Sequence, residues 1–338
     1  MTKARAGALP GSGAGNTPCW WGLVVRHSVR NAVAVLRMKK DRVATRQDAA
    51  HAFGITENIM TAPIQAADTA SIMGMAGSDP DRMLCAAFMP PPARELACTL
   101  LAFHNELLRA LQPARSSAVA GPLAGMVRLQ WWREVMEGTR PPEHGLAPVL
   151  LQAVADKRLS RETVLRLVQS VEMELDRQAS PDSVATPEAW EQMLRDGAGA
   201  LGVGMGQILG VGEAESLRAL EWCGMAYGAG AMLRHWSVLE GSGRFLFPGA
   251  LSALHQAGSA WAAQAEAFRR QSGGQGAGWR LAALPLVLAR RDLARYVSAG
   301  QGAAQAGRPR GVADRLAVML AGWKAARGLS KHARPQVS

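Results

Sequence analysis

The segment PPPARELACTLLAFHNELLRAL, residues 90–111, indicates the fold class most directly. Three prolines at its start favour a helix that begins just after them. Apolar side chains then recur with the three- and four-residue spacing of a helix that buries one face, at Leu96, Leu100, Phe103 and Leu107. The pattern predicts a core helix over residues 93–111.

The same helical spacing continues through most of the remaining chain. It predicts further helices over residues 122–138, 147–155, 160–175, 188–209, 213–239, 259–271, 280–297 and 312–326. Alternating strand patterns and the Asn-Gly pairs typical of tight hairpins are missing from the sequence. We therefore predict an all-α fold, with a single domain over residues 76–328.

The composition is that of a globular chain with unevenly distributed charge. The 338 residues are 48% hydrophobic and carry 38 Lys and Arg against 27 Asp and Glu, a formal net charge of +11. Residues 76–289 hold 19 basic and 21 acidic residues, so the excess lies at the two ends. No run of about 18 uncharged apolar residues occurs, so no membrane-spanning helix is expected. The four cysteines are scattered, which argues against a zinc–thiolate cluster.

The N-terminal end is basic and reads differently from the rest. Residues 1–75 carry nine Lys and Arg against four Asp and Glu, and no acid precedes Asp41. We expect this leader to be poorly structured. It is either an organelle transit peptide or an over-long gene start, with the true start at Met60, Met73 or Met75. Both interpretations place residues 1–75 outside the fold.

The C-terminal end holds the second excess. Residues 290–338 contain ten basic and two acidic residues, and we expect 329–338 to be a disordered basic tail. A basic end is either a solvated tail or a surface for an anionic membrane. Nucleic acid is not an expected partner, because the few aromatic residues are not interleaved with basic ones and no zinc-finger or RNP-like string occurs.

The string RLQWWRE, residues 128–134, is the most distinctive in the chain. Adjacent residues on a helix point about 100° apart, so only one of Trp131 and Trp132 is expected to enter the core. The other would line a cavity or a seam between helices. Core packing alone explains the pair as well as a ligand pocket does.

A pair of carboxylates offers the weak candidate for a metal site. Glu172 and Asp176 lie four residues apart on one helix face, with Glu174 turned away from them. Paired carboxylates hold Mg²⁺ in many proteins. The neighbouring Arg177 and the polar surroundings favour a solvated helix face instead.

Five strings together resemble the squalene/phytoene synthase family over residues 79–325. They are DPDR at 79–82, LAF at 101–103, LQWWR at 129–133, MLR at 232–234 and GRFLFP at 243–248. The resemblance implies an isoprenoid-synthase-like helical bundle around a central cavity. It also implies the family's reaction, in which two prenyl diphosphates are joined head to head with Mg²⁺ held by two aspartate-rich motifs.

The residues at the family's aspartate positions do not suit that reaction. By position they are Leu108, Arg109 and Gln112 in the first motif, and His235 and Leu239 in the second. Mg²⁺ requires oxygen ligands to stabilise the charge that develops on the departing diphosphate. We therefore expect no cofactor. Mg²⁺ would bind only if a displaced site, built from Glu106, Glu172 or Asp176, kept the chain active.

A shorter resemblance points to one branch of the family. The string FHNEL, residues 103–107, resembles the branch of the mitochondrial complex I assembly factor, which also lacks the aspartate pairs. Our hypothesis is a non-catalytic family member that acts as an assembly or isoprenoid/lipid-binding factor in respiratory complex I biogenesis. Its expected cavity residues are Phe103, Glu106, Trp131, Trp132, Arg133, Arg234 and Arg244.

The expected partners are a prenyl diphosphate or lipid ligand, an anionic membrane surface and a respiratory-complex subunit. The expected location is the cytoplasm, peripherally on the inner membrane, or the mitochondrial matrix if the leader is a transit peptide. The rival hypothesis is an active Mg²⁺-dependent prenyltransferase that makes phytoene, squalene or a related product.

Overall fold

The computed structural model describes residues 69–111, 122–180, 185–271 apart from 241, 243 and 245, 276–298 and 310–332. Within these ranges the regular structure is entirely helical, which confirms the all-α prediction. The α-helices are α2 (Thr69–Ala76), α3 (Pro80–Ala86), α4 (Pro91–Leu108), α5 (Pro122–Glu137), α6 (Ala147–Ala155), α7 (Arg161–Ala179), α8 (Pro187–Leu194), α9 (Ala200–Ile208), α10 (Ala214–Leu239), α11 (Leu251–Gln271), α12 (Ala277–Ala282), α13 (Pro285–Ser298) and α14 (Val312–His332).

Two of the predicted helices have internal breaks. The segment predicted over 188–209 is α8 and α9 joined by η3 (Arg195–Gly199), a single π-helical turn. The segment predicted over 280–297 is divided into α12 and α13, because Pro285 lacks an amide hydrogen and so suits the first position of a new helix. Periodicity alone does not detect either break.

Helical structure begins earlier than the sequence suggested. Helix α2 packs against α4, and the side-chain amide of Asn105 donates to the carbonyl oxygen of Met75 at 3.0 Å. The expected boundary between residues 75 and 76 therefore falls inside a helix. At the other end α14 continues to His332, beyond the expected limit at 328. Residues 1–68 and 333–338 lie outside the described residues.

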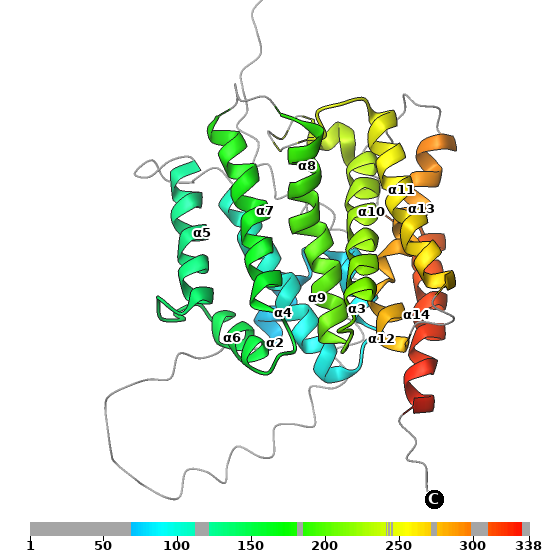
Figure 1. The fold of residues 1–338 in the computed structure, drawn as a ribbon, viewed down its shortest axis with the longest axis horizontal. Helices are drawn as coiled ribbons and strands as arrows, with labels where there is room; N and C mark the ends of the chain where they lie inside the picture. Colours follow the sequence, from blue (N-terminus) through cyan, green and yellow to red (C-terminus); the bar gives the residue numbers. More distant parts are fainter. Residues whose placement is uncertain are drawn as a thin grey trace, which may run out of the picture.

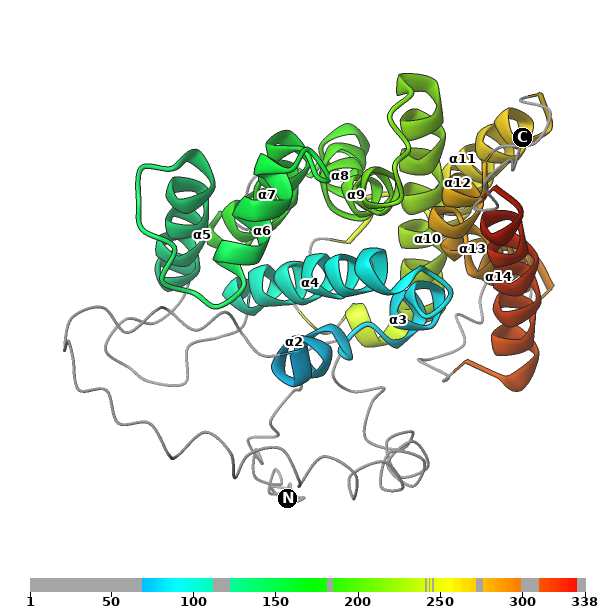
Figure 2. The same cartoon turned by 90° about the horizontal axis from the view of Figure 1, so that it is seen from below.

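Helix α10 is central to the arrangement. It contacts α9 and η3 on one side and α11 and α13 on the other. Figure 1 shows α5, α7, α8–α9, α10 and α11 as a row of upright helices, and Figure 2 shows α4 running across that row. Helix α14 lies at the edge of the molecule, against α12 and α13.

Glycines allow α10 to approach η3 and α9 closely. A Cβ atom on Gly224 would lie 2.1 Å from the carbonyl oxygen of Ala198, and one on Gly202 would lie 2.3 Å from that of Leu220. Both distances are shorter than any van der Waals contact, so neither position has room for a side chain. The small residues in these helices are therefore needed for packing.

Candidate functional site

The first family motif falls at the end of α4. Leu108 is buried, while Arg109 begins η2 (Arg109–Leu111) and is mostly exposed. The guanidinium of Arg109 lies 2.9 Å from a carboxylate oxygen of Glu106, and Arg128 lies 3.5 Å from the other oxygen. A cation therefore faces the one buried carboxylate of this segment. Gln112 lies outside the described residues.

The second family motif falls at the end of α10, where His235 and Leu239 are both buried. Burial, together with the positive charges of Arg234 and Arg310, lowers the pKa of His235 to about 4. The imidazole is therefore neutral near pH 7 and lies beside positive charge. A buried leucine and a neutral imidazole next to guanidinium groups do not fit Mg²⁺, a hard cation that prefers oxygen ligands.

The weak metal candidates lie on α7, where an arginine engages one of them. The Arg133 guanidinium contacts both oxygens of Glu172, with its Nε at 3.3 Å from Oε1, and it also donates to Gln169 at 3.3 Å. Asp176 is exposed on the same helix. In the described part of the chain, no group of three or more His, Cys, Asp or Glu side chains is placed to hold a metal.

Glu174 is a buried partner that the sequence analysis missed. Its side chain is buried, and both its oxygens bind Arg244, with Nη2 at 2.9 Å from Oε2. Glu174 lies three residues after Val171 and seven after Leu167, which are both buried. Helical spacing therefore contained the signal that Glu174 faces the core.

A buried histidine lies near this pair. Burial lowers the pKa of His104 on α4 to about 3, and the positive charges of Arg82 and Arg244 contribute in the same direction. His104 therefore stays neutral under physiological conditions. His104 directly follows the family string at 101–103, and the two arginines belong to the strings at 79–82 and 243–248. These three strings therefore lie near one another in the interior.

The aromatic residues of the site pack against one another. Trp132 is fully buried, and its ring lies 4.9 Å from that of Phe103 and 5.0 Å from that of His144, both edge to face. Trp131 is half-buried, with its ring 4.9 Å from that of Trp132. As expected for adjacent helical residues, one enters the core and the other remains at its edge. Phe103 and Trp132 form part of the packed core in this arrangement.

A second group of charged residues joins α3, α10, α13 and the start of α14. We call it the buried Asp–Arg cluster, and its members are Asp79, Asp81, Arg82, Tyr227, Arg234, Asp292 and Arg310.

The contacts within the buried Asp–Arg cluster link residues far apart in the sequence. Asp81 accepts from Arg310 at 2.8 Å and from the Tyr227 hydroxyl at 3.2 Å, and it lies 3.7 Å from Arg234. Arg310 also binds Asp292. The family strings at 79–82 and 232–234 therefore meet here, each arginine facing a carboxylate of the same chain.

Burial dominates the electrostatics of this cluster. It raises the pKa of Asp79 and of Asp292, although Arg82 and Arg310 oppose that rise. Two buried atoms, Oδ2 of Asp292 and Nη2 of Arg310, have no hydrogen-bond partner. The guanidinium of Arg82 also lies over the Tyr227 ring, 4.4 Å from its centroid. An anionic ligand at this place would have to compete with carboxylates already in contact with the arginines.

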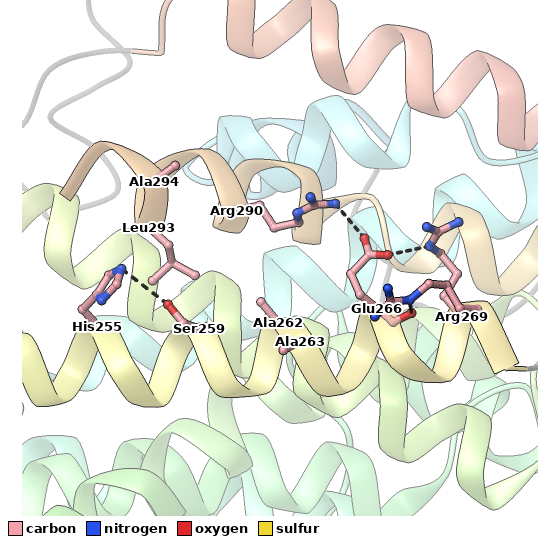
Figure 3. Close-up of a pocket in the computed structure, with 10 residues that line it drawn as sticks. His255, Ser259, Ala262, Ala263, Glu266, Arg269, Arg290, Leu293 and Ala294 are labelled. Carbon is pink, nitrogen blue, oxygen red and sulfur yellow. Dashed lines mark hydrogen bonds and ion pairs between the residues drawn. The ribbon is translucent and has the colours of Figure 1, made fainter. Parts of the chain in front are cut away.

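Two hollows differ in size and position. One, of about 20 Å³, lies between α3, α9, α10 and α12 beside Arg82, and has room for about one water molecule. The other is a groove of about 570 Å³ between α11 and α13. Figure 3 shows Glu266 in this groove between Arg290 and Arg269, with His255 and Ser259 further along it. None of the predicted cavity residues lines either hollow.

The fold and the strings within it define the class of protein. The family model for squalene/phytoene synthase matches residues 75–325, so the chain belongs to the squalene/phytoene synthase family. Within that class it is similar to NADH dehydrogenase (ubiquinone) complex I, assembly factor 6, from Rattus norvegicus, with 26% identity over 159 residues, 46% of this chain and 45% of the relative. The Mus musculus protein of the same name is 25% identical over 159 residues.

These comparisons have a limited span. The chain spans about half the length of the curated relatives it matches, 45% in each case. No solved structure matches the chain. Within the described residues, no helix is both long enough and apolar enough to cross a membrane.

Proposed function

We propose that the chain is a non-catalytic member of its family, and that it acts as an assembly or lipid-binding factor in respiratory complex I biogenesis. It works peripherally at an anionic membrane surface, either the cytoplasmic face of an inner membrane or the matrix side in a mitochondrion. Its ligand is a lipid or an isoprenoid, and its protein partner is a subunit of the respiratory complex.

One observation carries the proposal: arginines of the chain itself pair with two of the three carboxylates that a displaced metal site would use. Arg109 stands at an aspartate position and binds Glu106 at 2.9 Å. Arg133 engages Glu172 in the same way. A Mg²⁺ ion would have to displace a guanidinium in each case and then find further oxygen ligands. Losing one metal ligand from such a site costs on the order of a hundredfold in rate, or more.

The name of the curated relatives supports the assembly role. Both are complex I assembly factors by name, and the matched stretch of 159 residues is similar at 25–26% identity. The basic C-terminal end supports the membrane location, because anionic lipid attracts clustered Lys and Arg.

The test is whether the purified full chain releases diphosphate from farnesyl or geranylgeranyl diphosphate in the presence of Mg²⁺. We expect no release above the rate without protein. Robust Mg²⁺-dependent turnover would overturn the proposal and favour the prenyltransferase hypothesis. Loss of that turnover in Glu172→Ala and Asp176→Ala variants would then locate a displaced site on α7.

The assembly role has its own test. Deleting the gene in the source organism is expected to lower the amount of assembled complex I on native gels while leaving other respiratory complexes unchanged. Unchanged complex I would contradict the assembly role.

A further inference from the structure

Helix α14 has an unusual distribution of side chains. Its inner face carries Asp314, Val318, Gly322 and Ala325, which are buried. Gly322 lies directly against the ring of Phe88, where a Cβ atom would be only 2.5 Å away. Small residues such as Gly322 and Ala325 therefore let α14 pack closely against the rest of the protein. The large apolar residues of the helix lie on the opposite side.

The α14 outer face consists of large apolar side chains exposed to solvent. They are Val312 (74% exposed), Leu316 (49%), Met319 (47%), Leu320 (60%) and Trp323 (51%). Their spacing of four, three, one and three residues places them on one stripe of the helix. Isolated exposed apolar residues are normal in proteins, but a contiguous stripe marks an interaction surface.

Basic residues border this stripe. Arg315, Lys324 and Arg327 are exposed along α14, and the Arg327 guanidinium lies over the Trp323 ring, 3.3 Å from its centroid. The one acid of the helix, Asp314, is buried and paired with Arg291 and Arg295. The outer face therefore combines apolar side chains with positive charge and carries no carboxylate.

We propose that the α14 outer face lies on an anionic lipid bilayer, with its apolar stripe in the headgroup boundary and its basic residues against lipid phosphates. This inference rests on the membrane location in the proposed function and assigns it to one helix. Amphipathic helices with Trp and Leu on one face and Lys and Arg beside it bind membranes in this orientation.

The charge pattern favours a bilayer over a second copy of the chain. Two copies meeting through this face would bring Arg315, Lys324 and Arg327 of each together, and like charges oppose such contact. Lysine is also depleted at protein interfaces. Tryptophan beside a cation suits the membrane–water boundary, where the ring is partly buried and the cation reaches the phosphates.

The first experiment measures co-sedimentation of the full chain with vesicles of phosphatidylcholine, with and without phosphatidylglycerol. We expect binding to the anionic vesicles that weakens as salt is raised. The double substitution Leu320→Gln and Trp323→Gln is expected to weaken it by about tenfold or more. Lys324→Gln is expected to weaken it by about fivefold on anionic vesicles alone.

The matched control uses exposed apolar residues elsewhere. Leu123 and Val127 on α5 are 65% and 63% exposed, so Leu123→Gln with Val127→Gln likewise replaces two exposed apolar side chains by glutamine, away from α14. Vesicle binding of this control is expected to equal that of the unsubstituted chain. Circular dichroism of each variant verifies that the helices remain.

The outcomes separate this inference from the proposed function. Vesicle binding that the α14 variants leave intact would overturn the inference while the membrane location stands. No binding to anionic vesicles by the unsubstituted chain would overturn both. A dimer in sedimentation velocity that the double substitution dissociates would assign the face to a second copy and overturn the inference. Turnover of prenyl diphosphates would remove the non-catalytic proposal and leave the α14 inference untouched.

A second measurement locates the contact. Lipids brominated in their acyl chains are expected to quench part of the tryptophan emission of the bound protein. The substitution Trp323→Phe should keep vesicle binding within about twofold and remove most of that quenching. Equal quenching in both proteins would overturn the inference.

Discussion

The buried Asp–Arg cluster and the ion pairs of α4, α5 and α7 use the same chemical groups in different surroundings. Asp292 is fully buried and pairs with Arg310, itself almost fully buried. On α7, Glu172 pairs with Arg133, whose side chain is 26% exposed. A buried charge that loses its partner has no water to replace that partner, whereas a partly exposed charge does. The cluster is therefore expected to contribute to the free energy of unfolding. The ion pairs of α4, α5 and α7 are expected mainly to set the local charge.

Removing a charge from the cluster gives the largest expected effect. In Asp292→Asn the guanidinium of Arg310 loses its closest carboxylate, and we expect the free energy of unfolding to fall by about 3–5 kcal/mol. Urea denaturation at pH 7 measures the change. The matched variant is Glu266→Gln, which removes the surface pairs to Arg269 and Arg290 and is expected to cost less than about 1 kcal/mol. Equal losses in the two variants would contradict the distinction.

The pH dependence of stability is the next largest effect. The pKa of His235 is about 4 in the folded chain, against 6.5 for an ordinary histidine. As the pH falls below 6.5 the unfolded chain takes up this proton first, so protonation favours unfolding. The stability contributed by neutral His235 is fully present above pH 6.5 and is lost progressively down to about pH 4.

This loss amounts to about 3 kcal/mol, from 1.36 kcal/mol per pKa unit over about 2.5 units. Burial raises the pKa of Asp79 and Asp292, which acts in the opposite direction. The measurement is therefore the difference between the unsubstituted chain and His235→Gln, taken from urea denaturation at pH 7 and at pH 4.5. The variant should lose less stability over this range. Identical pH profiles would show that His235 titrates normally.

The pair of Glu174 and Arg244 lies between the two extremes. Glu174 is buried, whereas Arg244 is about one fifth exposed. We expect Glu174→Gln to lower the free energy of unfolding by about 2 kcal/mol, because hydrogen bonds to charged groups contribute about 1.5–3 kcal/mol. Urea denaturation measures the free energy of unfolding. Glu174→Asp keeps the charge but shortens the side chain, so it tests whether the length of the side chain matters for the pair. An unchanged free energy of unfolding in Glu174→Gln would mean that this pair behaves like the more exposed pair of Glu172 and Arg133.

The smallest effect is expected two residues away on the same helix. Glu172→Gln keeps the size and shape of the side chain and removes one charge from a partly exposed pair, so we expect a loss of about 0.5 kcal/mol. The helix and the substitution are the same as for Glu174→Gln, so the two variants isolate the effect of burial. A loss as large as that of Glu174→Gln would mean that burial does not decide the strength of these pairs.

Helical periodicity identified most elements and the five strings identified the family, but neither showed how the charged residues pair. The spacing of Leu96, Leu100, Phe103 and Leu107 sufficed to predict α4, since periodicity is a local property. Asp81 and Arg310, by contrast, are 229 residues apart. Nothing in either neighbourhood specifies the other, because their contact depends on how α3, α10 and α13 pack. The cluster therefore could not be predicted from one sequence.

Glu174 was missed for a different reason. Its position on the buried face of α7 was readable from Val171 and Leu167, but a carboxylate is expected to lie in water. The partner that makes burial tolerable, Arg244, belongs to a loop after α10. The sequence did not show that Glu174 pairs with Arg244, and this long-range pairing offsets the free-energy cost of burying the carboxylate.

The π-helical turn between α8 and α9 holds one residue more than an α-helical turn. Its i→i+5 hydrogen bonds enclose the extra residue, so α8 and α9 keep nearly the relative orientation of one continuous α-helix. An extra residue within α9 before Gly202 would not be absorbed in this way and would rotate the following residues by about 100°. Gly202 would then turn away from Leu220, and a bulkier neighbour would meet α10 where only a hydrogen atom fits. The chain is therefore expected to tolerate the loss of one residue from the π turn better than the gain of one residue in α9.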